Sequence, residues 1–123
     1  MGLDMMAYSI AEAPETPVDF ESNSEDRFEL HYWRKHPNLH GWMEKLYRSR
    51  EGENDEFNTS SVVLTPEDLD ALEQDILDSN LPKTSGFFFG SSDGQEKDGD
   101  LAFIAKARDA HAAGLAVVYY AWW

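Results

Sequence analysis

The chain has 123 residues, a formal net charge of −14 and no cysteine. This length suits one domain, residues 1–123, and the normal share of apolar and aromatic residues excludes a disordered acidic tail. The lack of cysteine excludes disulfide scaffolds, thiolate metal sites and cysteine nucleophiles. No stretch approaches the roughly 18 apolar residues of a membrane span, and the N-terminus lacks the pattern of a signal peptide. We therefore expect a cytoplasmic protein without a membrane partner.

The charge is arranged in blocks along the sequence. Residues 1–33 carry eight acids and one arginine, and residues 51–82 carry ten acids and no lysine or arginine. Residues 34–50 reverse this balance, with five bases and one acid. An acidic surface repels nucleic acid, because phosphate binding depends on Lys and Arg. We expect no direct nucleic-acid binding, and two explanations of the acidity stay open: solubility, or mimicry of nucleic-acid charge that blocks a host protein.

The first half of the chain predicts two strands and one helix. Residues 3–10 predict a short strand, followed by a mobile acidic loop at about 11–26. Residues 27–32 alternate with a period of two, as in a half-buried strand. The apolar members of that alternation are Phe28, Leu30 and Tyr32. Pro37 suits the first position of a helix. Apolar residues at spacings of three and four form one stripe on this helix: Leu39, Trp42, Met43, Leu46 and Tyr47.

The second half predicts three further strands and two helices. A short strand ends at 62–64, and Thr65 then caps a helix that begins at Pro66. The apolar run 86–90, bounded by glycines, predicts a buried strand, and residues 115–123 predict the last one. A third helix is expected from about Asp100 to Ala113. Its expected inward residues are Leu101, Ile104, Ala105 and Ala112.

This order of elements predicts an α+β fold. We expect a single compact domain in which a small mixed β-sheet packs against about three helices.

The stretch from His31 to Trp42 is the most informative for function. It holds three of the four histidines, two of the four tryptophans and two bases. Arg and Lys bind anionic groups, and Trp offers a flat face for a ring. A helix N-terminus also favours anions. The stretch therefore predicts a site for an anionic ligand, with nucleotides as one class. The structural alternative is that Trp42 lies in the core, that Trp33 packs at a strand edge, and that Arg34 and Lys35 pair with nearby acids.

No metal, cofactor or catalytic residue is predicted. His36 and His40 lie four apart, but Pro37 stands where the zinc-protease motif requires Glu. The sequence also lacks a nucleophile elbow, a phosphate-binding loop and a dinucleotide fingerprint. One enzymatic alternative stays open, a small hydrolase or transferase that uses His40 with a carboxylate such as Asp4.

Four sequence blocks together resemble a family of small phage and prophage proteins of unknown function. The blocks are Met1–Met5, Tyr32–Lys35 continuing to Leu39–Trp42, Leu81–Gly90, and the aromatic C-terminal end. Some family members carry the label phosphoglycerate kinase. This chain does not support that label, because it is too short for a two-lobed kinase and has no phosphate loop.

The resemblance implies a phage accessory protein that acts in the cytoplasm of an infected or lysogenic bacterial host. Such a protein would bind an anionic small molecule or a host protein, without catalysis, and so counter host defence. The expected ligand-binding residues are Trp33, Arg34, Lys35, His40, Trp42, Thr84 and Phe88. The alternatives are an acidic, nucleic-acid-mimicking inhibitor of a host protein and the small hydrolase or transferase.

Overall fold

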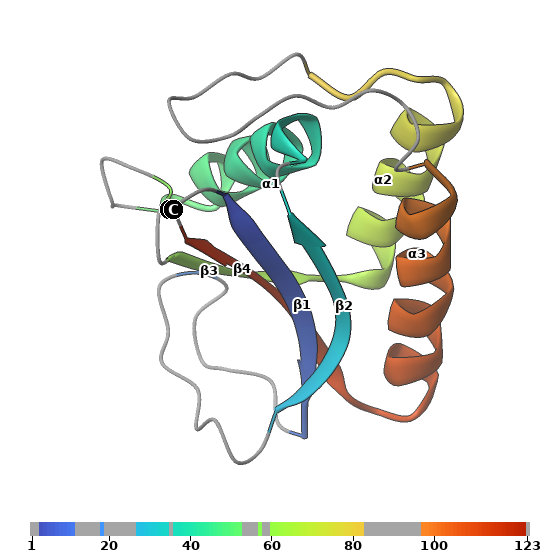
Figure 1. The fold of residues 1–123 in the computed structure, drawn as a ribbon. Helices are drawn as coiled ribbons and strands as arrows, with labels where there is room; N and C mark the ends of the chain where they lie inside the picture. Colours follow the sequence, from blue (N-terminus) through green and yellow to red (C-terminus); the bar gives the residue numbers. More distant parts are fainter. Residues whose placement is uncertain are drawn as a thin grey trace.

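The computed structural model describes residues 3–11, 18, 27–34, 36–52, 57, 60–82 and 97–122. The strands are β1 (Asp4–Ile10), β2 (Phe28–Arg34), β3 (Ser60–Leu64) and β4 (Ala116–Trp122). The helices are α1 (Pro37–Ser49), α2 (Pro66–Leu77) and α3 (Lys97–Ala112). The predicted α+β class is confirmed, and Figure 1 shows the arrangement of sheet and helices. The strand expected at 86–90 and nearly all of the acidic loop expected at 11–26 lie outside the described residues.

The described sheet has the strand order β2-β1-β4-β3. Where the sequence suggested a mixed sheet, all three ladders are antiparallel. The connection between β3 and β4 explains the second half of this arrangement. It contains α2 and α3, which pack against each other as an outward and a returning helix. The chain therefore comes back to the end of the sheet where β3 finished, and β4 runs antiparallel to β3.

One face of the sheet packs against all three helices and forms the core. Its strand residues alternate along each strand, as the pleat requires. The strands contribute Met5, Ala7, Trp33, Val62, Leu64, Val117, Tyr119 and Ala121. The helices contribute Leu39, Met43, Tyr47, Leu69, Leu72, Ile76, Phe103, Ile104 and Ala107. The opposite face of the sheet carries a smaller buried cluster of Tyr8, Ile10 and Val118.

Thr65 caps α2, as the sequence predicted, and the cap is a capping box with Asp68. The Thr65 side chain accepts a hydrogen bond from the Asp68 backbone N–H, and the Asp68 carboxylate accepts one from the Thr65 N–H. Arg50, which follows α1, donates to the Val63 carbonyl at 2.9 Å and to the Asp68 carboxylate at 2.7 Å. The end of α1, strand β3 and the first turn of α2 are thus joined through one arginine.

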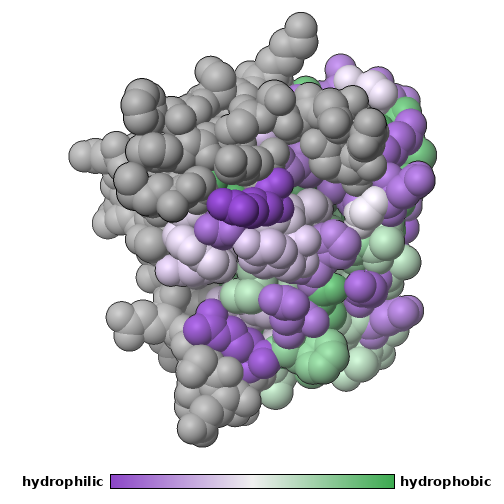
Figure 2. All heavy atoms as spheres, in the orientation of Figure 1, coloured by the Kyte–Doolittle hydropathy of each residue, from purple (hydrophilic) through white to green (hydrophobic). Residues whose placement is uncertain are grey.

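Strand β2 forms where the sequence predicts it, but with a different buried face. Phe28 and Tyr32 are 70% and 46% exposed, whereas Trp33 is buried. The β1–β2 register shifts by one residue, so that Leu30 has no residue opposite it on β1. Figure 2 shows hydrophobic residues gathered in the lower right part of the visible face, where Figure 1 places the start of β2 and the end of α3.

Helix α3 also turns a different face inward from the one predicted. Ile104 is buried and Leu101 is partly buried, but Ala105 and Ala112 are exposed. The buried residues are instead Asp100, Phe103, Ile104, Ala107 and Ala110. This face is selected by Trp33 of β2, because the tryptophan ring packs edge-on against Phe103 and its N–H reaches Asp100.

Replacing Thr65 with alanine is expected to lower the free energy of unfolding by about 1 kcal/mol, since it removes the side-chain half of the capping box. Urea denaturation measures the change. Ser49→Ala is the matched control, because its exposed hydroxyl donates only to the Leu46 carbonyl at the end of α1. An equal loss in both variants would show that the cap contributes nothing specific.

Candidate functional site

The structure describes four of the seven predicted ligand residues: Trp33, Arg34, His40 and Trp42. The other three, Lys35, Thr84 and Phe88, lie outside the described residues. The four are not gathered in one place. Trp33 points into the core while its neighbour Arg34 is exposed beside Asp4, on the other face of β2. His40 is buried inside the core, and Trp42 lies half-buried between α1 and α2.

Trp33 belongs to a buried polar cluster centred on Asp100. The Trp33 indole donates to one carboxyl oxygen of Asp100 at 2.8 Å, and His36 Nε2 lies 2.9 Å from the other. His31 packs on the Trp33 ring with centroids 4.6 Å apart. Burial, with a further contribution from Lys106, lowers the pKa of His31. The Trp33 ring and its N–H are therefore already used in contacts within the fold, as expected for a structural residue rather than a ligand-binding one.

His40 is part of an aromatic stack in the core. Its Nδ1 lies 2.7 Å from the Tyr119 hydroxyl, and its ring stacks on Phe57 with centroids 4.8 Å apart. Burial lowers the pKa of His40 to about 4 and raises that of Tyr119 well above its usual value. His40 is consequently neutral at physiological pH.

The catalytic pairing of His40 with Asp4 does not form. The Asp4 carboxylate accepts a hydrogen bond from Tyr32 and lies 3.7 Å from Arg34, on the sheet face that the helices leave uncovered. His40 contacts Tyr119 on the helix-covered face. The sheet separates the two side chains, because alternate residues of β1 and β4 point to opposite sides.

Most of the positive charge of block 34–50 is paired within the fold. Arg34 lies near Asp4, Arg48 lies 3.5 Å from Glu44 in the next turn, and Arg50 binds Asp68. Lys35 lies outside the described residues. Among the bases of this block that the structure describes, Lys45 alone has no ion pair with a described acid. Lys45 is therefore the described base of this block with a charge that an anionic ligand could meet.

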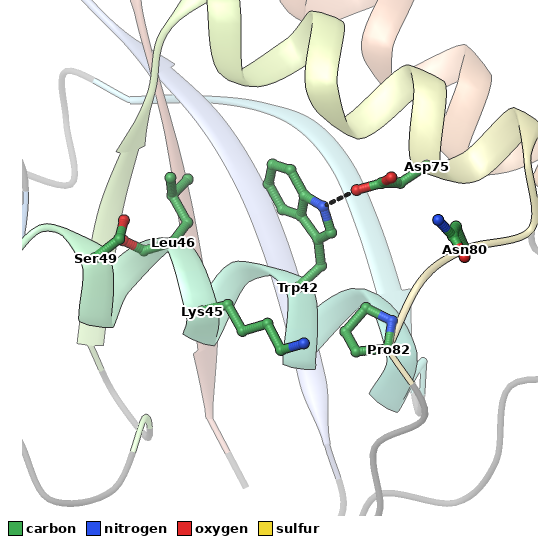
Figure 3. Close-up of a pocket in the computed structure, with 7 residues that line it drawn as sticks. All are labelled: Trp42, Lys45, Leu46, Ser49, Asp75, Asn80 and Pro82. Atoms are coloured by element: carbon green, nitrogen blue, oxygen red, sulfur yellow. Dashed lines mark hydrogen bonds between the residues drawn. The ribbon is translucent and has the colours of Figure 1, made fainter.

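Lys45 lines a cavity of about 420 Å³ between α1 and the segment that follows α2. The spacing of three and four residues along α1 places its lining residues on one helix face. These residues are Trp42, Lys45, Leu46 and Ser49. Asp75, Asn80 and Pro82 complete the lining from the other side, as Figure 3 shows. The backbone N–H of Asn80 donates to the Asp75 carbonyl at 2.7 Å and so closes the turn after α2.

The lining combines a flat ring, a cation and polar acceptors. The Trp42 indole donates to one carboxyl oxygen of Asp75 at 2.8 Å, which fixes the plane of the ring. The ammonium group of Lys45 points toward Pro82 in Figure 3. A planar molecule can stack on such a ring while its anionic group meets the lysine.

Sequence reasoning identified Trp42 but missed the rest of this cavity. The signal for Lys45 and Ser49 was present, because they lie three and seven residues after Trp42 on the same helix. Asp75 and Asn80 come from a distant segment, and only the packing of α2 against α1 brings them there. No local pattern could have assigned them.

Four of the ten acids in block 51–82 form contacts with described residues outside the block. Asp68 caps α2 and binds Arg50, and Asp75 accepts the Trp42 N–H. Asp70 and Glu73 both bind Arg108 of α3, at 2.9 and 2.8 Å. These four carboxylates hold helices together, so fewer are available to imitate a row of phosphates.

A scan against models of protein families, and searches of curated proteins and of solved structures, found no match for this chain. In the described ranges, no three side chains of His, Cys, Asp or Glu are grouped as metal ligands. No helix within these ranges has the length and apolar character needed to cross a bilayer.

Asp100→Ala is expected to lower the free energy of unfolding by about 2–4 kcal/mol, because it leaves the buried Trp33 and His36 nitrogens without their partner. Asp98→Ala is the control, since it removes an exposed acid from the same first turn and should cost about 0.5 kcal/mol. Chemical denaturation of both variants gives the comparison. Similar losses would mean that only the helix dipole is affected.

The buried His40 is expected to make stability depend on pH. Its pKa is about 4 in the folded protein and 6.5 in the unfolded chain, so protonation favours unfolding. The stabilisation is complete above pH 6.5 and is lost as the pH falls toward 4, by about 2 kcal/mol between pH 7 and pH 5. NMR titration of the ring protons should give a midpoint near 4, with His40→Gln identifying the resonance. A midpoint near 6.5 would contradict the prediction.

Proposed function

We propose that this chain is a non-enzymatic binding protein whose cavity between α1 and α2 takes a small planar ligand with an anionic group. The observation that carries the proposal is the meeting of Trp42 and Lys45 in one cavity. Lys45 is the described base of block 34–50 that forms no ion pair with a described acid, and it stands beside a fixed indole ring.

The lining matches a nucleotide-like ligand in its chemistry. The ring of the ligand would lie against Trp42, Leu46 and Pro82, and its phosphate would meet Lys45. The Asp75 oxygen that does not accept the Trp42 N–H would accept a hydrogen bond from an amino group of the ligand. The volume of about 420 Å³ lies within the range of small-molecule sites.

The biological setting follows from the resemblance to phage and prophage proteins. A small accessory protein that sequesters a nucleotide signal would blunt a host defence in an infected or lysogenic bacterium. Binding is favoured over catalysis by the location of His36 and His40, since His36 is held by Asp100 and His40 lies in the core. Binding is favoured over charge mimicry by the carboxylates of α2 that are already paired.

The test is calorimetric titration with linear and cyclic mono- and dinucleotides, together with the melting temperature. We expect at least one to bind, and Lys45→Ala to weaken it roughly tenfold or more, about 1.4 kcal/mol. Trp42→Phe should weaken stacking and remove the quenching of tryptophan fluorescence by the ligand. Arg48→Ala is the matched control, since it removes one positive charge from the same helix outside the cavity.

Two results would overturn the proposal. The first is that no nucleotide changes the melting temperature or gives heat on titration. The second is an equal loss of affinity in Lys45→Ala and Arg48→Ala, which would indicate general charge attraction. A host protein recovered from lysate at low salt and lost at high salt, without nucleotide binding, would instead favour the acidic inhibitor.

A further inference from the structure

A second cleft, separate from the cavity at Trp42, lies between the start of β2 and the C-terminal half of α3. Its volume is about 750 Å³. The strand side includes Ser9, Phe28 and Leu30, and the helix side includes Lys106, Ala110 and Leu115. The lining is largely apolar, and it coincides with the hydrophobic area in the lower right part of Figure 2.

One wall of this cleft is an edge strand. β2 is the outermost strand of the described sheet on that side, and no described strand pairs with its outer edge. An edge strand presents N–H and C=O groups that another extended chain can pair with. The end of β2 is covered, because Trp33 and His31 pack against Phe103. The start of β2 stands free of this contact.

The side chains at the start of β2 also leave a surface that another molecule could contact. Phe28 is 70% exposed, which is the largest exposure among the described large hydrophobic residues. Ser9 lies across the β1–β2 ladder from Phe28 and is only 3% exposed. It also lines the cleft. An aromatic ring as exposed as Phe28, lining a largely apolar cleft, is typical of a surface that another molecule covers.

We propose that the start of β2 and the C-terminal half of α3 bind an extended peptide segment of a partner protein. The segment adds to the open edge of β2 as a further strand. Its main chain pairs with β2, and every second side chain enters the cleft beside Leu30 and Ala110. The edge of β2, with which no described strand pairs, favours a peptide over a small apolar molecule, because only a main chain matches its alternating donors and acceptors.

Charge selects the kind of peptide. Glu29 and Asp109 also line the cleft, against the single base Lys106, and the whole chain carries −14. A second copy of the chain would meet strong like-charge repulsion, which argues against self-pairing through β2. The occupant that fits is a basic segment with apolar side chains at alternate positions. This surface is independent of the cavity at Trp42, so either proposal can fail without the other.

The test is selection of a displayed library of random ten-residue peptides on the immobilised full chain. We expect enrichment of alternating basic and apolar sequences. A synthetic copy of a selected peptide should shift the backbone amide resonances of β2 and α3. Methylation of its alternate backbone nitrogens should weaken binding at least tenfold, because those nitrogens can no longer pair with β2.

Phe28→Ala should weaken the same peptide at least fivefold. Leu77→Ala is the matched control, since it removes another exposed hydrophobic side chain, 49% exposed, at the end of α2. Enrichment that is equally strong on Phe28→Ala, or full binding by the methylated peptide, would overturn the proposal. A dimer in solution that Phe28→Ala converts to a monomer would also overturn it, in favour of a second copy.

Discussion

The arrangement of this domain depends on one buried carboxyl group. Asp100 lies at the start of α3, and its two oxygens meet Trp33 at the end of β2 and His36 just before α1. The consecutive elements β2 and α1 are thereby fixed to α3, which is distant in sequence. Because such a group is costly to bury without partners, the two nitrogens and the carboxyl must be brought together as a unit. The inward face of α3 and the buried face of β2 both follow from this contact.

Polar contacts also determine which positive charges are paired within the fold. In this acidic chain with few bases, two arginines join helices and strands. Arg50 connects α1, β3 and α2, and Arg108 connects α2 to α3. The lysines at positions 45 and 106 form no ion pair with any described residue, and each lines one of the two hollows. The charges of Arg50 and Arg108 are therefore used to join elements of the fold, whereas those of Lys45 and Lys106 are not paired with any described acid.

Local signals predicted the elements well and their faces less well. The cap at Thr65 and the proline at the start of α1 are written in adjacent residues, and both are confirmed. The face of α3 was misjudged because a long-range bond to Trp33 outweighs the aliphatic pattern of Leu101 and Ala105. The prediction of which β2 side chains face the core was wrong, because no sequence rule reveals the shifted register at Leu30. The partners of Trp42 come from α2 and the turn after it, which only tertiary packing supplies.

The shifted register at Leu30 determines which positions of β2 tolerate substitution. Without the extra residue, Phe28 and Trp33 would face opposite sides of the sheet, since five positions separate them. With it, both face the helices, one inside the core and one at the open cleft. The strand is thus divided into two parts under different constraints. The end of β2 is constrained by the core around Trp33, whereas at the start of β2 the exposed Phe28 can be replaced at little cost to stability.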